Sequence, residues 1–215
     1  MDIRTKEAVR YLGYGTCAID EQVMQLIQES FVELEQVAVP RCIYRIFELS
    51  VPDVNKIQIG NTMIESKNLS KNLFGCEQVI LLGATLGAEV DRGIRKLEVL
   101  DITKALVMQA CATAYLEEYL DDMQDELAKD LEKQQRYIRP RFSPGYGDFS
   151  ILHQKDILKM LETTKHIGVS LTDGFMLTPT KSVTAVMGIS KTKEPCHGRG
   201  CEECTKSDCA YRRSE

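Results

Sequence analysis

The chain has 215 residues, of which 43% are hydrophobic, and a formal net charge of −5. This length predicts one domain with at most a small appendage, and the hydrophobic content is sufficient for a buried core. The acidic balance argues against nucleic acid or an anionic membrane surface as the main partner. The first residues lack the apolar stretch of a signal peptide, and no apolar run approaches the ~18 residues of a membrane span. We therefore expect a cytoplasmic protein.

Capping residues and apolar periodicity predict the helices. Asp20 is a good N-cap for a helix whose apolar face carries Val23, Ile27 and Leu34, and Pro40 stops it. The other predicted helices cover residues 5–12, 69–74, 86–97, 102–135 and 151–161. In the longest of them, small residues in the first half let another element pack closely, and an apolar seam continues through Leu116, Leu120, Met123 and Leu127.

Strands are predicted where β-branched and aromatic residues gather. They cover residues 41–51, a hairpin over 57–64 with a Gly-Asn turn, a buried strand over 79–84, and a strand pair over 175–178 and 183–189. Strands and helices mix without a regular βαβ repeat. We therefore expect an α+β domain over residues 1–190, with a mostly antiparallel sheet surrounded by helices, followed by a Cys-rich metal-binding tail over 191–215.

The segment from Arg141 to Asp148 reads Arg-Phe-Ser-Pro-Gly-Tyr-Gly-Asp and carries the groups that a small zwitterionic ligand requires. Pro144 and Gly145 fit the central positions of a type II turn, where Gly supplies the positive φ and lets a ligand approach the backbone. Arg141 could hold a carboxylate through paired hydrogen bonds, and Tyr146 could stack on a base or a cation. Taken alone, such a segment is more often a structural turn between a strand and a helix.

The run from Tyr137 to Ser190 resembles the activation domain of cobalamin-dependent methionine synthase. The matching segments are Arg141-x-Ser143-Pro144-Gly145-Tyr146, Glu162–Gly168 at the end of a helix, Leu171–Met176 and Pro179–Thr184. In that family the Arg-x-x-Pro-Gly-Tyr segment lies in the site for S-adenosylmethionine (SAM). The resemblance therefore implies that Arg141, Ser143, Gly145 and Tyr146 bind SAM, with Arg141 on the methionine carboxylate. Residues 1–136 resemble the short, free-standing members of the family.

Two features depart from the family pattern. After the Tyr of the motif, the fused enzymes continue Pro-x-Cys-Pro-x-His, whereas this chain continues Gly147-Asp148-Phe149-Ser150. The far end of the fused domain is replaced here by a cysteine cluster. Ligand residues beyond the turn are therefore left open.

The longest predicted helix also carries the acidic residues Glu117, Glu118, Asp121 and Asp122. Such a run is usually a solvated helix face. The alternative is that Glu117 reaches the ammonium group of the ligand.

Half of the eight cysteines lie in the last twenty residues, at Cys196, Cys201, Cys204 and Cys209. The two residues between Cys201 and Cys204 let both thiolates face one ion, so these four predict a metal site. The set suits tetrahedral zinc or an iron–sulfur cluster, and its compact spacing slightly favours the cluster. A disulfide pair is less expected in a cytosolic chain. The other four, Cys17, Cys42, Cys76 and Cys111, are expected to be buried free thiols.

The resemblance implies a SAM-binding accessory protein that reactivates a cobalamin-loaded methyltransferase in trans, most simply a methionine synthase without its own activation domain. In that family, one electron and the methyl group of SAM restore methylcobalamin, and the partner carries the cobalamin. A redox cluster in the tail would suit the electron step. The alternative is a non-catalytic docking or regulatory module whose tail holds a structural zinc ion.

Overall fold

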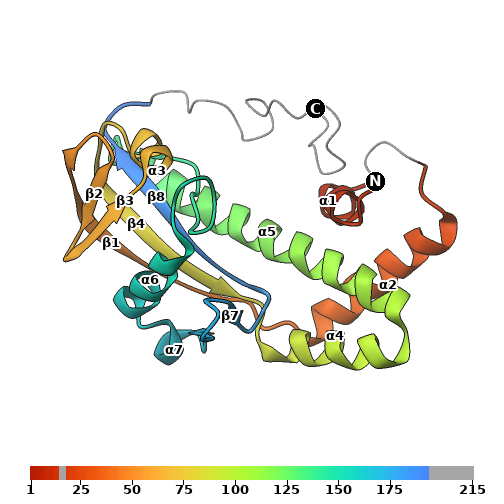
Figure 1. Cartoon of the computed structure of the whole chain (residues 1–215). Helices are drawn as coiled ribbons and strands as arrows, with labels where there is room; N and C mark the ends of the chain where they lie inside the picture. The colour runs from red at the N-terminus through yellow and green to blue at the C-terminus, as the bar shows by residue number, and fades with distance from the viewer. Residues whose placement is uncertain (15–17, 194–215) are drawn as a thin grey trace. The chain divides into compact units, whose positions relative to one another are not determined.

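The computed structural model describes residues 1–14 and 18–193, which form two compact units (Figure 1). The first unit comprises Met1–Pro40 and Leu86–Asp121. The second comprises Arg41–Thr85 and, of the described residues, 122–193. The long helix α5 (Ile102–Glu132) contributes residues to both units. In the part of the chain that the structure describes, no helix is both long and apolar enough to span a membrane.

The first unit is helical and contains α1 (Ile3–Tyr11), α2 (Glu21–Val37), α4 (Ala88–Leu100) and the first part of α5. The predicted N-cap of α2 is confirmed, because the carboxylate of Asp20 accepts a hydrogen bond of 2.9 Å from the amide of Gln22. The small residues of α5 are buried as predicted, namely Ala105, Ala110, Cys111, Ala112 and Ala114. Burial raises the pKa of the Cys111 thiol to about 12, so this cysteine is a packing residue.

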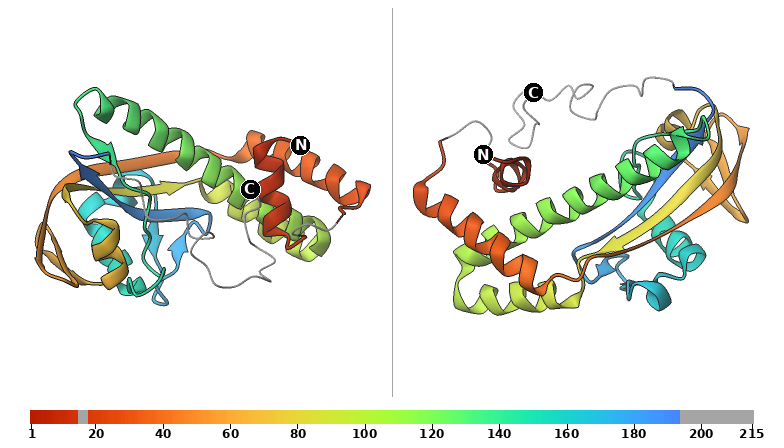
Figure 2. Two further views of the ribbon diagram at one scale, coloured as in Figure 1. Left: turned by 90° about the horizontal axis from the view of Figure 1, so that it is seen from above. Right: turned by 180° about the vertical axis from the view of Figure 1, so that it is seen from behind.

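The second unit is built on an antiparallel sheet of six strands in the order β3-β2-β1-β4-β8-β5. The strands are β1 (Arg41–Asp53), β2 (Lys56–Ile59), β3 (Thr62–Glu65), β4 (Cys76–Thr85), β5 (Tyr137–Ile138) and β8 (Ser182–Ser190). The long strands β1, β4 and β8 lie side by side in all views (Figure 2). The predicted α+β class, antiparallel pairing and hairpin over 57–64 are confirmed.

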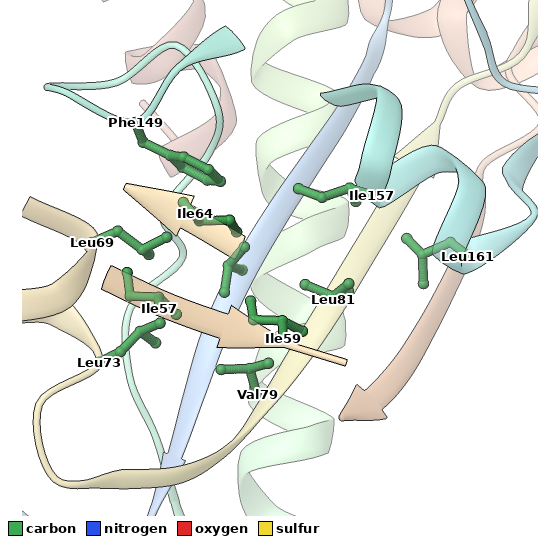
Figure 3. Packing of buried hydrophobic residues seen from close by; sticks show 11 residues of the cluster. Ile57, Ile59, Ile64, Leu69, Leu73, Val79, Leu81, Phe149, Ile157 and Leu161 are labelled. Carbon is green, nitrogen blue, oxygen red and sulfur yellow. The ribbon is translucent and has the colours of Figure 1, made fainter. Parts of the chain in front are cut away.

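One face of this sheet forms the main core of the second unit (Figure 3). Val79 and Leu81 of β4 point to this face, where α3 (Lys67–Asn72) and α6 (Gln154–Leu161) pack with the β2–β3 hairpin. A 3₁₀ turn (Ile151–His153) precedes α6, and α7 (Thr163–His166) follows it. The cluster also includes Phe149, which is 1% exposed and comes from the loop before the 3₁₀ turn.

Two predictions need correction. Residues 175–178 do not pair with the following strand: β7 (Leu177–Thr178) pairs with β6 (Ser170–Leu171) in a separate two-stranded sheet. Pro179 follows β7 directly and has no backbone N–H with which to extend the ladder. Of the cysteines expected to be buried, Cys42 and Cys76 are only half-buried, and Cys17 falls outside the described residues.

Candidate functional site

The backbone from Tyr137 to Phe142 runs along the edge strand of the sheet and ends at the predicted ligand turn. Its first residues form β5, and Phe142 then exchanges two hydrogen bonds of 2.9 Å with Val186 of β8. The backbone directly after Arg141 is therefore fixed by its pairing with β8. A side chain on such a backbone is better positioned than one on an isolated loop.

Residues Ser143–Tyr146 form the predicted tight turn. The amide of Tyr146 donates a hydrogen bond of 3.2 Å to the carbonyl of Ser143. Gly145 has φ +94°, the positive value that the third position of a type II turn requires, so the turn prediction is confirmed. The side chain of Tyr146 is 69% exposed, which leaves its ring face accessible to a ligand.

A second turn follows at once and closes on the first. The amide of Phe149 donates to the carbonyl of Tyr146 at 3.0 Å, and the carbonyl of Phe149 accepts from the amide of Gly145 at 2.7 Å. The ring of Phe149 lies in the hydrophobic cluster beside Ile64 and Leu69 (Figure 3). The burial of the Phe149 ring therefore anchors the double turn to the hydrophobic core of the second unit.

The ring of Phe149 also belongs to a short aromatic stack. Its centroid lies 6.3 Å from that of Phe142 and 5.7 Å from that of His153, both in stacked geometry. His153 Nδ1 lies 3.0 Å from the carboxylate of Asp156, which orients the imidazole. These contacts assign a packing role to His153.

Arg141 is half-buried, and its guanidinium Nη1 donates a hydrogen bond of 3.0 Å to Gln124 Oε1. Gln124 lies in the part of α5 that belongs to the second unit. A fixed guanidinium presents its donors in a planar fork that matches a carboxylate. Sequence reasoning did not identify Gln124, because an exposed-looking Gln in a long helix carries no local signal of a partner.

Asp148 fastens the second turn to another element. Its carboxylate accepts hydrogen bonds from Ser66 Oγ at 2.5 Å and from the amides of Lys67 and Asn68 at 2.7 and 3.1 Å. Ser66 is the N-cap of α3, and these two amides belong to the first turn of that helix. The hydroxyl of Ser66, followed by the two amides, holds the pKa of Asp148 below its ordinary value of 3.8.

Glu117 lies on α5 in the first unit, whereas Arg141, Ser143, Gly145 and Tyr146 all lie in the second. Glu117 is partly buried. Burial of Tyr11 raises the pKa of that phenol, and the negative charge of Glu117 raises this pKa further. Its role toward the ammonium group of a ligand stays a prediction.

The predicted metal ligands Cys196, Cys201, Cys204 and Cys209 fall outside the described residues. Within residues 1–14 and 18–193, no group of three or more His, Cys, Asp and Glu side chains is arranged to hold a metal ion. The metal site of the tail therefore stays a prediction from the cysteine spacing.

Comparison with known proteins supports the resemblance seen in the sequence. Residues 108–198 match the family model described as "Vitamin B12 dependent methionine synthase, activation domain". The matched segment contains Gln124, Arg141 and the whole double turn. No curated protein matches the chain.

A solved structure also shares the fold. It is described as the crystal structure of the MetH reactivation domain bound to AdoHcy, and it matches with a TM-score of 0.61. The match covers 90% of this chain and 78% of that chain, at 17% sequence identity. The resemblance to the activation domain of methionine synthase is thus confirmed by a family model and by a fold.

Proposed function

We propose that this protein binds SAM at the turn Ser143–Tyr146 and supports the reductive methylation of cobalamin carried by a partner methyltransferase. The observation that supports this most directly is the turn itself, with positive φ at Gly145, an exposed Tyr146 ring and an Arg141 side chain held by Gln124. All of these groups lie within the segment that matches the activation-domain model. The fold is shared with a domain solved with AdoHcy, which is SAM without its methyl group.

The cofactors supply the chemistry when they are bound: one electron and the methyl group of the SAM sulfonium restore methylcobalamin and leave AdoHcy. The protein therefore binds and orients, and it needs no general acid or base. Arg141 binds the methionine carboxylate through its planar fork. The backbone around Ser143 and Gly145 contacts the ligand, and the ring of Tyr146 packs on it.

The carboxylate contact is tested with two ligands and two variants. The wild-type protein is expected to bind SAM about tenfold or more tightly than decarboxylated SAM, which lacks only that group. Arg141→Ala is expected to weaken SAM binding by roughly 1.5–3 kcal/mol and to bind the two ligands alike. Calorimetric titration measures all four affinities.

Arg136→Ala is the matched control, because the guanidinium of Arg136 also donates to a glutamine amide oxygen, that of Gln78, in the same unit. It is expected to bind SAM like the wild type. Unchanged SAM affinity in a folded Arg141→Ala protein would sink the assignment of the site.

Action in trans requires a separate assay. A cob(II)alamin methionine synthase without its own activation domain is mixed with a reductant and SAM, with and without this protein. We expect faster recovery of methylcobalamin that depends on both SAM and Arg141. If recovery is unchanged by the protein across several partner methyltransferases, the docking-module function takes its place.

We also propose that Cys196, Cys201, Cys204 and Cys209 hold one metal centre per chain, an iron–sulfur cluster or a zinc ion. The support is the cysteine spacing alone. Metal analysis of an anaerobic preparation distinguishes iron with sulfide from zinc. Cys204→Ser is expected to lower the metal content, while Cys42→Ser, in a strand of the second unit, is expected to leave it unchanged.

A further inference from the structure

We infer that Asp148 is a positioning residue that ties the ligand turn to the start of α3 and so holds Gly145 and Tyr146 in their binding geometry. This inference rests on the proposed function and assigns a task to a residue that the proposed ligand contacts do not use. It also assigns a task to α3, which lies about eighty residues earlier in the chain.

The first argument is the geometry of the carboxylate. Asp148 is exposed, yet it accepts hydrogen bonds from Ser66 Oγ, from the amide of Lys67 and from the amide of Asn68. Such bonds to an ionised acceptor are shorter and stronger than bonds between neutral groups. An exposed carboxylate that exchanges water for donors of one distant element acts as a cross-link between two parts of the chain.

The second argument is the fit of Gly147 against the same helix. Gly147 has φ +55°, and a Cβ atom there would overlap the side-chain amide of Asn68. The double turn and the first turn of α3 therefore meet through two consecutive residues, Gly147 by close approach and Asp148 by hydrogen bonds.

The third argument is how the cross-link reaches the ligand residues. Asp148 directly precedes Phe149, whose carbonyl accepts from the amide of Gly145 and whose amide donates to the carbonyl of Tyr146. Phe149 itself is fixed in the core. With Asp148 and Phe149 both held, the peptide planes of Gly145 and Tyr146 have little freedom, and the turn is pre-organised for its ligand.

The cross-link is distinct from a helix cap. The hydroxyl of Ser66 already caps α3, because it accepts a hydrogen bond of 3.0 Å from the amide of Leu69. The carboxylate oxygens of Asp148 accept from the amides of Lys67 and Asn68, and these oxygens belong to a different part of the chain. Its removal should therefore loosen the double turn more than it weakens the fold.

Asp148→Asn tests the inference through hydrogen exchange and ligand affinity. In the protein without ligand, the amides of Gly145 and Tyr146 are expected to exchange about tenfold faster than in the wild type. SAM is expected to bind about tenfold more weakly, with a melting temperature lowered by only a few degrees. The amide of Thr172, in a loop remote along the chain, serves as the internal reference.

Asp2→Asn is the matched control. Asp2 caps α1 in the first unit and accepts from the amide and the hydroxyl of Thr5 at 2.7 and 2.9 Å, a similar set of donors. This variant is expected to lose a similar amount of stability while exchange at Gly145 and affinity for SAM stay unchanged.

The outcomes separate this inference from the proposed function. If the wild type binds SAM and Asp148→Asn binds it equally well, the positioning role is wrong and the proposed function stands. If exchange at Gly145 and Tyr146 is unchanged, the positioning role is likewise wrong. If the wild type binds no SAM, the proposed function fails and the positioning role fails with it.

Discussion

Two loops of the second unit, both within the segment that matches the activation-domain model, are held in different ways. The loop Thr172–Met176 connects β6 to β7 and is closed by its own residues: the amide of Met176 donates to Thr172 Oγ1 at 3.1 Å, and the amide of Thr172 donates to the Met176 carbonyl at 2.9 Å. The loop Ser143–Phe149 is closed by internal bonds as well, but Asp148 also fastens it to Ser66, which is 82 residues away in sequence.

The difference shows where a binding loop gets its rigidity. A loop closed by neighbouring residues can open without disturbing another element, so its opening free energy is limited to a few local hydrogen bonds. A loop that is also bonded to a helix and anchored by a buried ring must break those contacts together. Three of the proposed ligand residues, Ser143, Gly145 and Tyr146, lie in the second kind of loop.

The largest effect is expected from Gly145→Val, a substitution in the tight turn of the loop Ser143–Phe149. Gly145 has φ +94°, and a Cβ there would also lie 3.2 Å from Ile151 Cδ1. Strain of this kind costs about 1–3 kcal/mol, and β-branching increases it. Denaturant unfolding should show Gly145→Val less stable than Gly145→Ala, and calorimetry should show weaker SAM binding in the same order. Equal stability of the two variants would contradict the turn geometry.

The next effect is expected from Gly147→Ala, which separates the loop from α3. The new methyl group overlaps the Asn68 amide, and φ +55° is itself unfavourable for Ala, so a loss of roughly 1–2 kcal/mol is expected. Adding Asn68→Ala removes the overlap but leaves the backbone strain. The double variant should therefore recover part of the loss in unfolding free energy; no recovery would show that Asn68 is not the obstacle.

The same contrast explains what the sequence could predict. The α+β class and the β2–β3 hairpin follow from local periodicity. The type II turn at Pro144-Gly145 follows from residue types that permit few alternatives. Asp20 as an N-cap also follows from its immediate neighbours. The hairpin, the turn and the cap are each determined within about ten residues of chain.

The features that the sequence did not predict depend on distant partners. The sequence identifies Asp148 only as a carboxylate near the turn, because no neighbouring residue indicates that Ser66 and the amides of α3 donate hydrogen bonds to it. The helix α3 was expected from residue 69, whereas Ser66 caps it and it begins at Lys67. Had Ser66 been taken as the cap, the first turn of α3 would have offered two amides that need an acceptor. The partner of Arg141, Gln124, was missed for the same reason.

A smaller effect is expected from Thr172→Val in the self-closed loop. The substitution removes the hydroxyl that accepts from the amide of Met176, a loss of about 1 kcal/mol. Exchange of the Met176 amide should rise, while exchange at Gly145 and SAM affinity should not change. Faster amide exchange at Gly145 in this variant would mean that the two loops are coupled and that the contrast between them is wrong.

The smallest effect is the pH dependence of the cross-link, because the Asp148 carboxylate is exposed and solvent screens it. The hydrogen bonds from Ser66 and the two amides lower its pKa in the folded protein below the ordinary value of 3.8. The unfolded chain therefore binds the proton more readily, so the contribution of Asp148 to stability is complete above that value. It is lost as the pH falls through the lower pKa of the folded state. The difference in unfolding free energy between the wild type and Asp148→Asn should accordingly be constant near neutral pH and shrink below about pH 4. A difference that persists unchanged at the lowest pH would mean that the ionised form is not what holds the loop to α3.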